Sequence, residues 1–135
     1  MARSPEHDTQ VAYFSWARLH QRARRAYAIP NGGKRNLITA ARLKAEGVRA
    51  GVLDVCLPIA VGESHGLYIE FKAGSNNLST EQAQEVADLV DDGYTVLVCW
   101  DAEMAIKFTL EYLRGEAPVG VTLLKPRKAV ARSSR

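Results

Sequence analysis

Two apolar segments of this chain are interrupted by charged residues, and this feature most constrains its fold. Asp54 lies within residues 51–57, and Glu70 and Lys72 lie within residues 66–72. Both segments are typical of β-strands, where a buried ion is costly unless a partner compensates its charge. Glu70 and Lys72 are two positions apart, so they point to the same face of a strand. An aspartate on the adjacent strand would meet them there, and the sequence therefore predicts a divalent-metal site of the kind used in phosphodiester hydrolysis.

The length and composition indicate one globular domain. The chain has 135 residues, of which 47% are hydrophobic and 24% charged, and this is enough for a sizeable core. No apolar run approaches the roughly 20 residues needed to span a membrane. The N-terminus lacks the apolar core of a signal peptide, so we expect a cytoplasmic protein with no membrane partner. Cys56 and Cys99 lie in predicted strands without CxxC spacing, which predicts buried free thiols.

The net charge of +3 conceals an uneven distribution along the chain. Residues 18–49 contain nine basic residues and one acid, whereas residues 54–116 contain twelve acids and three bases. Residues 125–135 contain five bases and no acid. A basic first third and a basic tail favour a polyanionic partner such as DNA. For any single charge, a solvated helix face is the alternative interpretation.

The hydrophobic periodicity predicts one mixed α/β domain over residues 1–124. Residues 125–135 are predicted to form a flexible basic tail. Turn and capping signals separate the elements, including a possible capping box between Ser79 and Gln82. The expected helices cover residues 4–25, 36–46, 79–92 and 102–114. The expected strands cover residues 27–29, 52–57, 67–72, 95–100 and 119–124.

An ordered set of motifs resembles one known family. The motifs are Ile-Pro-Asn-Gly-Gly-Lys-Arg at 29–35, Leu-Lys-Ala-Glu-Gly-Val-Arg-Ala-Gly at 43–51, Asp54, Tyr-Ile-Glu-Phe-Lys at 68–72 and Leu-Ser-Thr-Glu-Gln at 78–82. Together they resemble the VRR-NUC domain of the PD-(D/E)xK nuclease superfamily, in the small stand-alone form of phages and prophages, over roughly residues 6–113. Two positions depart from the family pattern, because Leu53 replaces its usual proline and Ala50 replaces the second arginine of Val-Arg-Arg.

The resemblance implies a restriction-endonuclease-like α/β fold, with a central mixed β-sheet flanked by α-helices, and a metal-dependent deoxyribonuclease. It implies cleavage of DNA phosphodiesters with Mg²⁺ or Mn²⁺, by a structure-selective endonuclease acting as a homodimer on branched DNA such as four-way junctions. A phage-encoded protein of this kind would act in the cytoplasm of the bacterial host. The alternative function is a non-catalytic DNA-binding module that retains the nuclease fold, and a more distant one is an unrelated α/β protein with structural charges.

The resemblance also assigns roles to individual residues. Asp54, Glu70 and the carbonyl of Phe71 are the expected metal ligands, since Mg²⁺ prefers carboxylate and carbonyl oxygens. Lys72 is expected to hold the attacking water or to stabilise the charge that develops on phosphorus. The alternative for Glu70 and Lys72 is a structural ion pair on one face of an edge strand.

Further catalytic and DNA-binding assignments concern five residues, four of which also have a structural alternative. Glu6 matches an acid on the family's first helix that reaches toward the metal, but an acid there also complements the helix dipole. Gln82 matches a glutamine that orients water or phosphate, although a capping box explains it equally well. Lys34 and Arg35 follow two glycines and are expected to contact a DNA phosphate, with a plain turn as the alternative. Arg49 is a further expected phosphate contact.

Overall fold

The computed structural model describes residues 5–30 and 37–126. Its centre is a five-stranded sheet in the order β1-β2-β3-β4-β5. The first three strands pair antiparallel, whereas β3, β4 and β5 are parallel to one another. The bounds of the strands are β1 Tyr27–Ala28, β2 Val55–Leu57, β3 Leu67–Phe71, β4 Thr95–Cys99 and β5 Val121–Leu124. The predicted mixed sheet flanked by helices is therefore confirmed.

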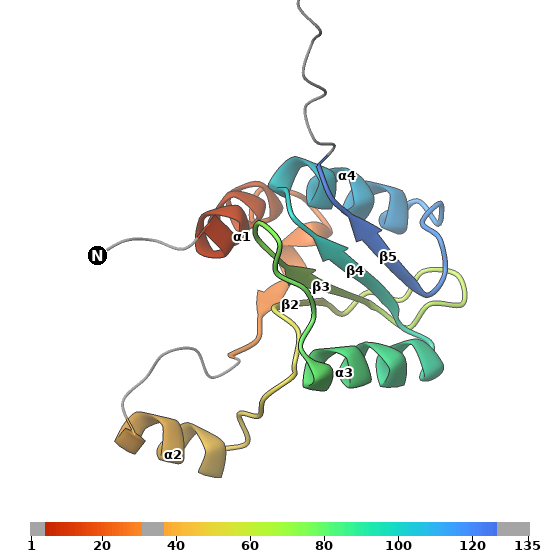
Figure 1. Cartoon of the computed structure of the whole chain (residues 1–135). Helices are drawn as coiled ribbons and strands as arrows, with labels where there is room; N and C mark the ends of the chain where they lie inside the picture. Colours follow the sequence, from red (N-terminus) through yellow and green to blue (C-terminus); the bar gives the residue numbers. More distant parts are fainter. Residues whose placement is uncertain (1–4, 31–36, 127–135) are drawn as a thin grey trace, which may run out of the picture.

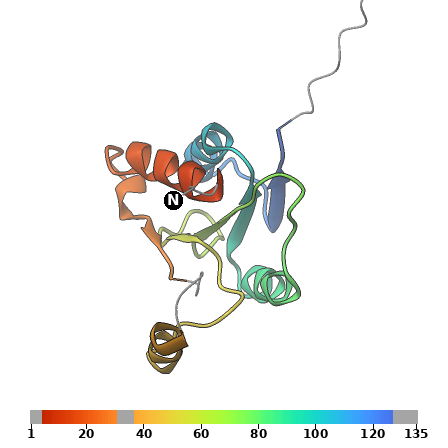
Figure 2. The same ribbon diagram turned by 60° about the vertical axis from the view of Figure 1, so that its left-hand side comes forward.

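Helices cover both faces of this sheet. Helices α1 (Pro5–Ala17) and α4 (Ala102–Leu113) lie on one face, and α3 (Thr80–Asp91) lies on the other, as Figures 1 and 2 show from two sides. Ser79 caps α3 through the predicted capping box with Gln82, and the side chain of Asp101 caps α4. The caps fix where the two helices begin: α3 follows β3 after the loop of residues 72–79, and α4 begins almost directly after β4.

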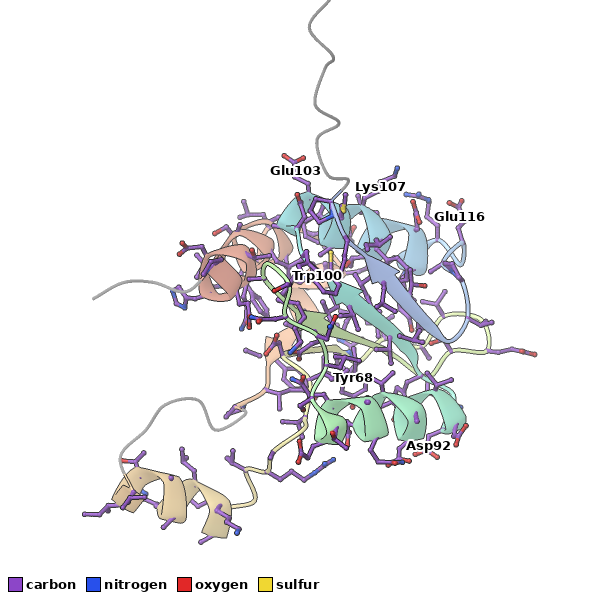
Figure 3. All side chains as sticks on the ribbon, viewed as in Figure 1. Tyr68, Asp92, Trp100, Glu103, Lys107 and Glu116 are labelled. Carbon is purple, nitrogen blue, oxygen red and sulfur yellow. The ribbon has the colours of Figure 1, made fainter. Side chains whose placement is uncertain are left out.

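Successive side chains of β3 point to opposite faces of the sheet and pack into two separate core clusters. Ile69 and Phe71 are fully buried in the cluster that contains residues of α1 and α4. Tyr68 packs instead with the cluster on the α3 side, toward which it points in Figure 3. Because side chains alternate between the faces of a strand, Glu70 and Lys72 share the face of Tyr68. The two charged residues are therefore directed toward the start of α3.

The first helix is shorter than the sequence indicated. It ends at Ala17 rather than near residue 25, and a short 3-10 helix, η1, follows at Ala23–Arg25. The ring nitrogen Nδ1 of His20 accepts hydrogen bonds from the backbone N–H groups of Arg22 and Ala23, both at 3.1 Å. This side-chain contact offers the backbone an alternative to continuing the helix, and it turns the chain toward β1.

Helix α2 (Leu37–Ala45) lies apart from the sheet in both ribbon views (Figures 1 and 2). None of its residues is buried, and Leu37 and Ile38 are largely exposed.

Cys56 and Cys99 are buried free thiols, as predicted. None of the helices in the described part of the chain is long and apolar enough to cross a membrane. Residues 31–36 and the predicted tail beyond residue 126 lie outside the described residues.

Candidate active site

Two backbone N–H groups fix Asp54, one at the end of β3 and one just after β1. It directly precedes β2, which pairs antiparallel with β3. The N–H of Phe71 donates to Asp54 Oδ2 at 2.8 Å, and the N–H of Ile29 donates to the Asp54 carbonyl at 2.8 Å. The expected meeting of Asp54 with the Glu70–Lys72 segment on the neighbouring strand is thus present.

Gln82 joins Glu70 and Lys72 into one hydrogen-bonded network. Its Nε2 group donates to Glu70 Oε2 at 2.9 Å, while its Oε1 atom accepts from Lys72 Nζ at 2.8 Å. The same Oε1 atom accepts from the N–H of Ser79 at 3.0 Å, which closes the capping box. The two interpretations of Gln82 are therefore compatible, because one amide group both caps α3 and contacts the two charged side chains.

Glu70 is the most strongly perturbed acid of this site. It is 2% exposed, and its Oε1 atom is buried with no hydrogen-bond partner. Burial, followed by the charge of Asp54, raises the pKa of Glu70 to about 8, although Lys72 and Gln82 act in the opposite direction. Burial also raises the pKa of Asp54, against the effect of the Phe71 N–H and with a smaller contribution from Glu6. Burial therefore disfavours the ionised form of both carboxyl groups, and the charge of Asp54 adds to this effect at Glu70.

Glu6 reaches the site from α1. The amide of Asn76 donates to Glu6 Oε2 at 3.3 Å, and the charge of Glu6 contributes to the raised pKa of Asp54. The Asn76 contact joins residues 70 positions apart, and no local pattern in the sequence pointed to it. Within residues 5–30 and 37–126, however, no three His, Cys, Asp or Glu side chains are close enough to form a metal-binding group.

The donor set of the pair Asp54 and Glu70 fits a hard divalent cation. Mg²⁺ usually takes one or two protein carboxylates and completes its coordination with water and substrate oxygens, so a third carboxylate is not required. A cation beside these acids would give the unpartnered Oε1 atom of Glu70 a partner and would offset the burial that raises the pKa of both acids. The fit therefore depends on two acids and the neighbouring Phe71 carbonyl.

The predicted DNA contacts are only partly within the described structure. Lys34 and Arg35 lie outside the described residues. The side chain of Arg49 is 61% exposed, and its NH2 atom lies 2.8 Å from Glu85 Oε1 on α3. An acid therefore already pairs with Arg49, and a phosphate would have to compete with Glu85 for it.

Comparison with known proteins bears on the family and the fold of the chain. The sequence model of the VRR-NUC domain family matches residues 1–101. A solved structure described as a VRR-NUC domain protein superposes with a TM-score of 0.69 at 23% identity, covering 90% of this chain and 96% of that chain. This structural likeness confirms the restriction-endonuclease-like α/β fold. No curated protein matches the chain. Because the family match spans most of its 135 residues, the chain belongs to the VRR-NUC family of nuclease-type, DNA-processing domains.

Proposed function

We propose that this protein is a divalent-metal-dependent endonuclease that hydrolyses phosphodiester bonds in branched DNA such as four-way junctions. The observation that carries the proposal is the buried Glu70 carboxylate, which has an unpartnered oxygen and lies beside Asp54 and Lys72. A buried acid beside a second, partly buried acid and one lysine is costly as a purely structural feature, whereas it suits a site that binds a cation. Strongly perturbed acids of this kind concentrate at functional sites.

In this proposal Asp54, Glu70 and the Phe71 carbonyl hold Mg²⁺ or Mn²⁺, and Glu6 lies near enough to contribute through water. When bound, the ion supplies a Lewis acid for the scissile phosphate and neutralises the two acids. The N–H of Phe71 fixes the orientation of Asp54, and the amide of Gln82 fixes that of Glu70. These contacts hold the ligand oxygens in place before the substrate arrives.

Lys72 is the proposed catalytic cation of the chain itself. Its Nζ atom is held by Gln82 Oε1 at 2.8 Å and lies 3.3 Å from Glu70 Oε2. Its remaining donor capacity is available to a phosphate oxygen or to the attacking water. An ammonium group in this mostly buried setting stabilises charge that develops on phosphorus more strongly than it would in open solvent.

The remaining parts of the proposal concern the assembly around this site. Residues 1–124 form the nuclease domain, and residues 125–135 add a basic tail that increases affinity for DNA. Two copies form a homodimer that places two sites for symmetric cutting of two strands. Lys34, Arg35 and Arg49 contact the phosphate backbone, and the protein acts in the cytoplasm.

Cleavage of labelled four-way junction, flap and linear duplex DNA tests this proposal directly. Each substrate is incubated with Mg²⁺, Mn²⁺ or EDTA, with Asp54→Ala as the control. We expect metal-dependent cutting of the branched substrates that the variant lacks. Tight binding without cutting in either metal would instead establish a non-catalytic DNA-binding module, and sedimentation of the same samples tests the homodimer.

A further inference from the structure

Three residues that follow the parallel strands lie in a row at one edge of the sheet. Lys72 follows β3, Trp100 follows β4 and Lys125 follows β5. The N–H of Lys72 donates to the Cys99 carbonyl at 3.0 Å, and the N–H of Trp100 donates to the Leu124 carbonyl at 3.1 Å, so the pairing continues past the strand ends. Neighbouring strands are about 4.8 Å apart, and the row therefore leads directly away from the candidate active site. Carboxyl ends of parallel strands are common ligand-binding positions.

An open pocket lies at the far end of this row. Its volume is about 540 Å³, within the roughly 300–1,000 Å³ typical of ligand sites. The indole Nε1 group of Trp100 donates to the Gly74 carbonyl at 3.1 Å, which fixes the plane of the ring against the loop between β3 and α3 (Figure 3). The pocket is lined by Gly74, Ser75, Trp100, Lys125 and Pro126, none of which is an acid.

The same loop connects this pocket to the active site. Gly74 follows Lys72 by two residues, and Asn76 in the same turn donates to Glu6 Oε2 at 3.3 Å. The N–H of Asn76 also donates to the Ala73 carbonyl at 3.1 Å, which closes the turn. A DNA strand with its scissile phosphate at Lys72 would therefore have its neighbouring nucleotide beside Trp100.

The pocket combines an aromatic ring of fixed orientation with a cation. The Nζ atom of Lys125 lies 4.6 Å from the centroid of the Trp100 ring. A lysine over a partly exposed ring is held weakly, whereas a nucleobase stacked on an aromatic ring binds more strongly. A base can therefore displace Lys125 from the ring, which leaves its ammonium group free for the adjacent phosphate.

We propose that this pocket, named here the Trp100 pocket, binds an unpaired nucleobase of the DNA strand that is cut. Trp100 stacks on the base, and Lys125 contacts the next phosphate. Bases inside a continuous duplex have both faces covered by their neighbours, so a base at the branch must be unpaired and unstacked to use the ring. The inference rests on the proposed function, and it makes Trp100 a specificity-determining residue for DNA with an unpaired nucleotide at the branch.

The test uses the fluorescence of Trp100 itself. The chain has two tryptophans, and Trp16→Phe leaves Trp100 as the single emitter. In a variant that also carries Asp54→Ala, with EDTA present, the full chain is titrated with oligo(dT), with a flap substrate and with a blunt duplex. We expect oligo(dT) and the flap substrate to quench the emission, and the blunt duplex to leave it nearly unchanged. The matched control, Trp100→Phe with Trp16 intact, is expected to show no quenching by any of the three.

Affinities measured by anisotropy with labelled DNA complete the test. Trp100→Ala is expected to weaken oligo(dT) binding about tenfold and to leave duplex binding unchanged. Trp100→Phe retains part of the affinity because it keeps an aromatic face. Absence of quenching by oligo(dT), or equal quenching by the duplex, overturns the proposal. If Trp100→Ala does not fold, fluorescence quenching of Trp100 in the Trp16→Phe chain still tests whether the pocket binds a base.

Cleavage by the wild-type chain separates this inference from the function on which it rests. If the chain cuts DNA in a metal-dependent way but DNA does not quench Trp100, only the proposal that the Trp100 pocket binds a base is refuted. Quenching without cutting in either metal refutes the proposed nuclease but leaves the base-binding pocket in place.

Discussion

Glu70 Oε2 lies 3.3 Å from Lys72 Nζ, and the amide of Gln82 contacts both atoms. The ion pair satisfies one oxygen of Glu70 and leaves Oε1 buried without a partner. A pair built for stability alone would satisfy every buried polar atom, since each unpaired one is costly. The incomplete pairing is what one expects of a side chain whose second oxygen has another ligand.

Replacement of Asp54 separates catalysis from folding. Asp54→Asn keeps an oxygen that accepts from the Phe71 N–H but removes the negative charge needed for a divalent ion. Cleavage is expected to fall by more than about a hundredfold, while the melting temperature stays equal or rises because burial disfavours the charged form. Gel assays and thermal melts check both effects. Cleavage at the wild-type rate would show that Asp54 is not a ligand.

The raised pKa of Glu70 predicts how stability depends on pH in the metal-free protein. The pKa rises from an ordinary 4.5 to about 8 in the folded state, so folding favours the protonated form. In EDTA, the contribution of Glu70 to the free energy of unfolding is therefore fully present below about pH 4.5. It is lost as the pH rises through about 8. Asp54 acts in the same direction, because its pKa is also raised.

Thermal melts between pH 5 and pH 8.5 measure this dependence. In Glu70→Gln, which mimics the protonated acid, the fall in melting temperature toward high pH is expected to be smaller than in the wild type. Mg²⁺ is expected to stabilise the wild type more at pH 8.5 than at pH 5, because the ion binds the ionised acids. If the melting temperature of Glu70→Gln depends on pH as that of the wild type does, the raised pKa of Glu70 is contradicted.

Lys72 is predicted to act in the chemical step. Lys72→Ala is expected to lower kcat about 10²- to 10³-fold, because it removes a charge aimed at the scissile phosphate. Lys72→Arg is expected to restore little of this rate, since a planar guanidinium does not fit the position between Glu70 and Gln82. Single-turnover cleavage with saturating enzyme measures the rate, and junction binding in EDTA is the control, expected to change by less than about threefold. Cleavage at the wild-type rate by either variant would contradict a role of Lys72 in the chemical step.

Gln82 is predicted to affect stability and activity together. Gln82→Ala removes the capping box and the contacts to Glu70 and Lys72, with an expected loss of about 2 kcal/mol in unfolding free energy. Gln84→Ala is the matched control, because Gln84 lies on the exposed side of the same helix, where its Nε2 group donates to Asp88 Oδ1 at 2.9 Å. Urea denaturation compares the two variants. Equal losses of unfolding free energy in the two variants would show that the hydrogen bonds of Gln82 do not stabilise the fold.

Arg49 is predicted to contribute to DNA binding in competition with Glu85. Arg49→Ala is expected to reduce the salt dependence of binding by about one phosphate contact, and Glu85→Ala to strengthen binding by freeing the arginine. Arg114→Ala is the control, because Arg114 forms a similar exposed pair with Glu116, at 3.0 Å. Binding isotherms at several salt concentrations provide the measurement. An unchanged salt slope in Arg49→Ala would exclude the contact.

The length of the first helix shows where local reasoning reached its limit. Its apolar and basic stripes continue past residue 17, so periodicity alone extended the helix to residue 25. The contacts of His20 with two backbone N–H groups end it earlier, and a side chain that competes for the backbone leaves no periodic signal. The other described helices and strands were found within a few residues, because turn signals or caps separate them clearly.

The sequence by itself determined the order of the elements, the shared face of Glu70 and Lys72 and the family, since these follow from local periodicity and motif spacing. Tertiary structure alone decided that Asn76 contacts Glu6, that Arg49 pairs with Glu85, and that the pKa of Glu70 is raised to about 8. The physical reason is that pairing over long sequence distances and loss of solvent both depend on how the elements pack. Neither is encoded in any short stretch of residues.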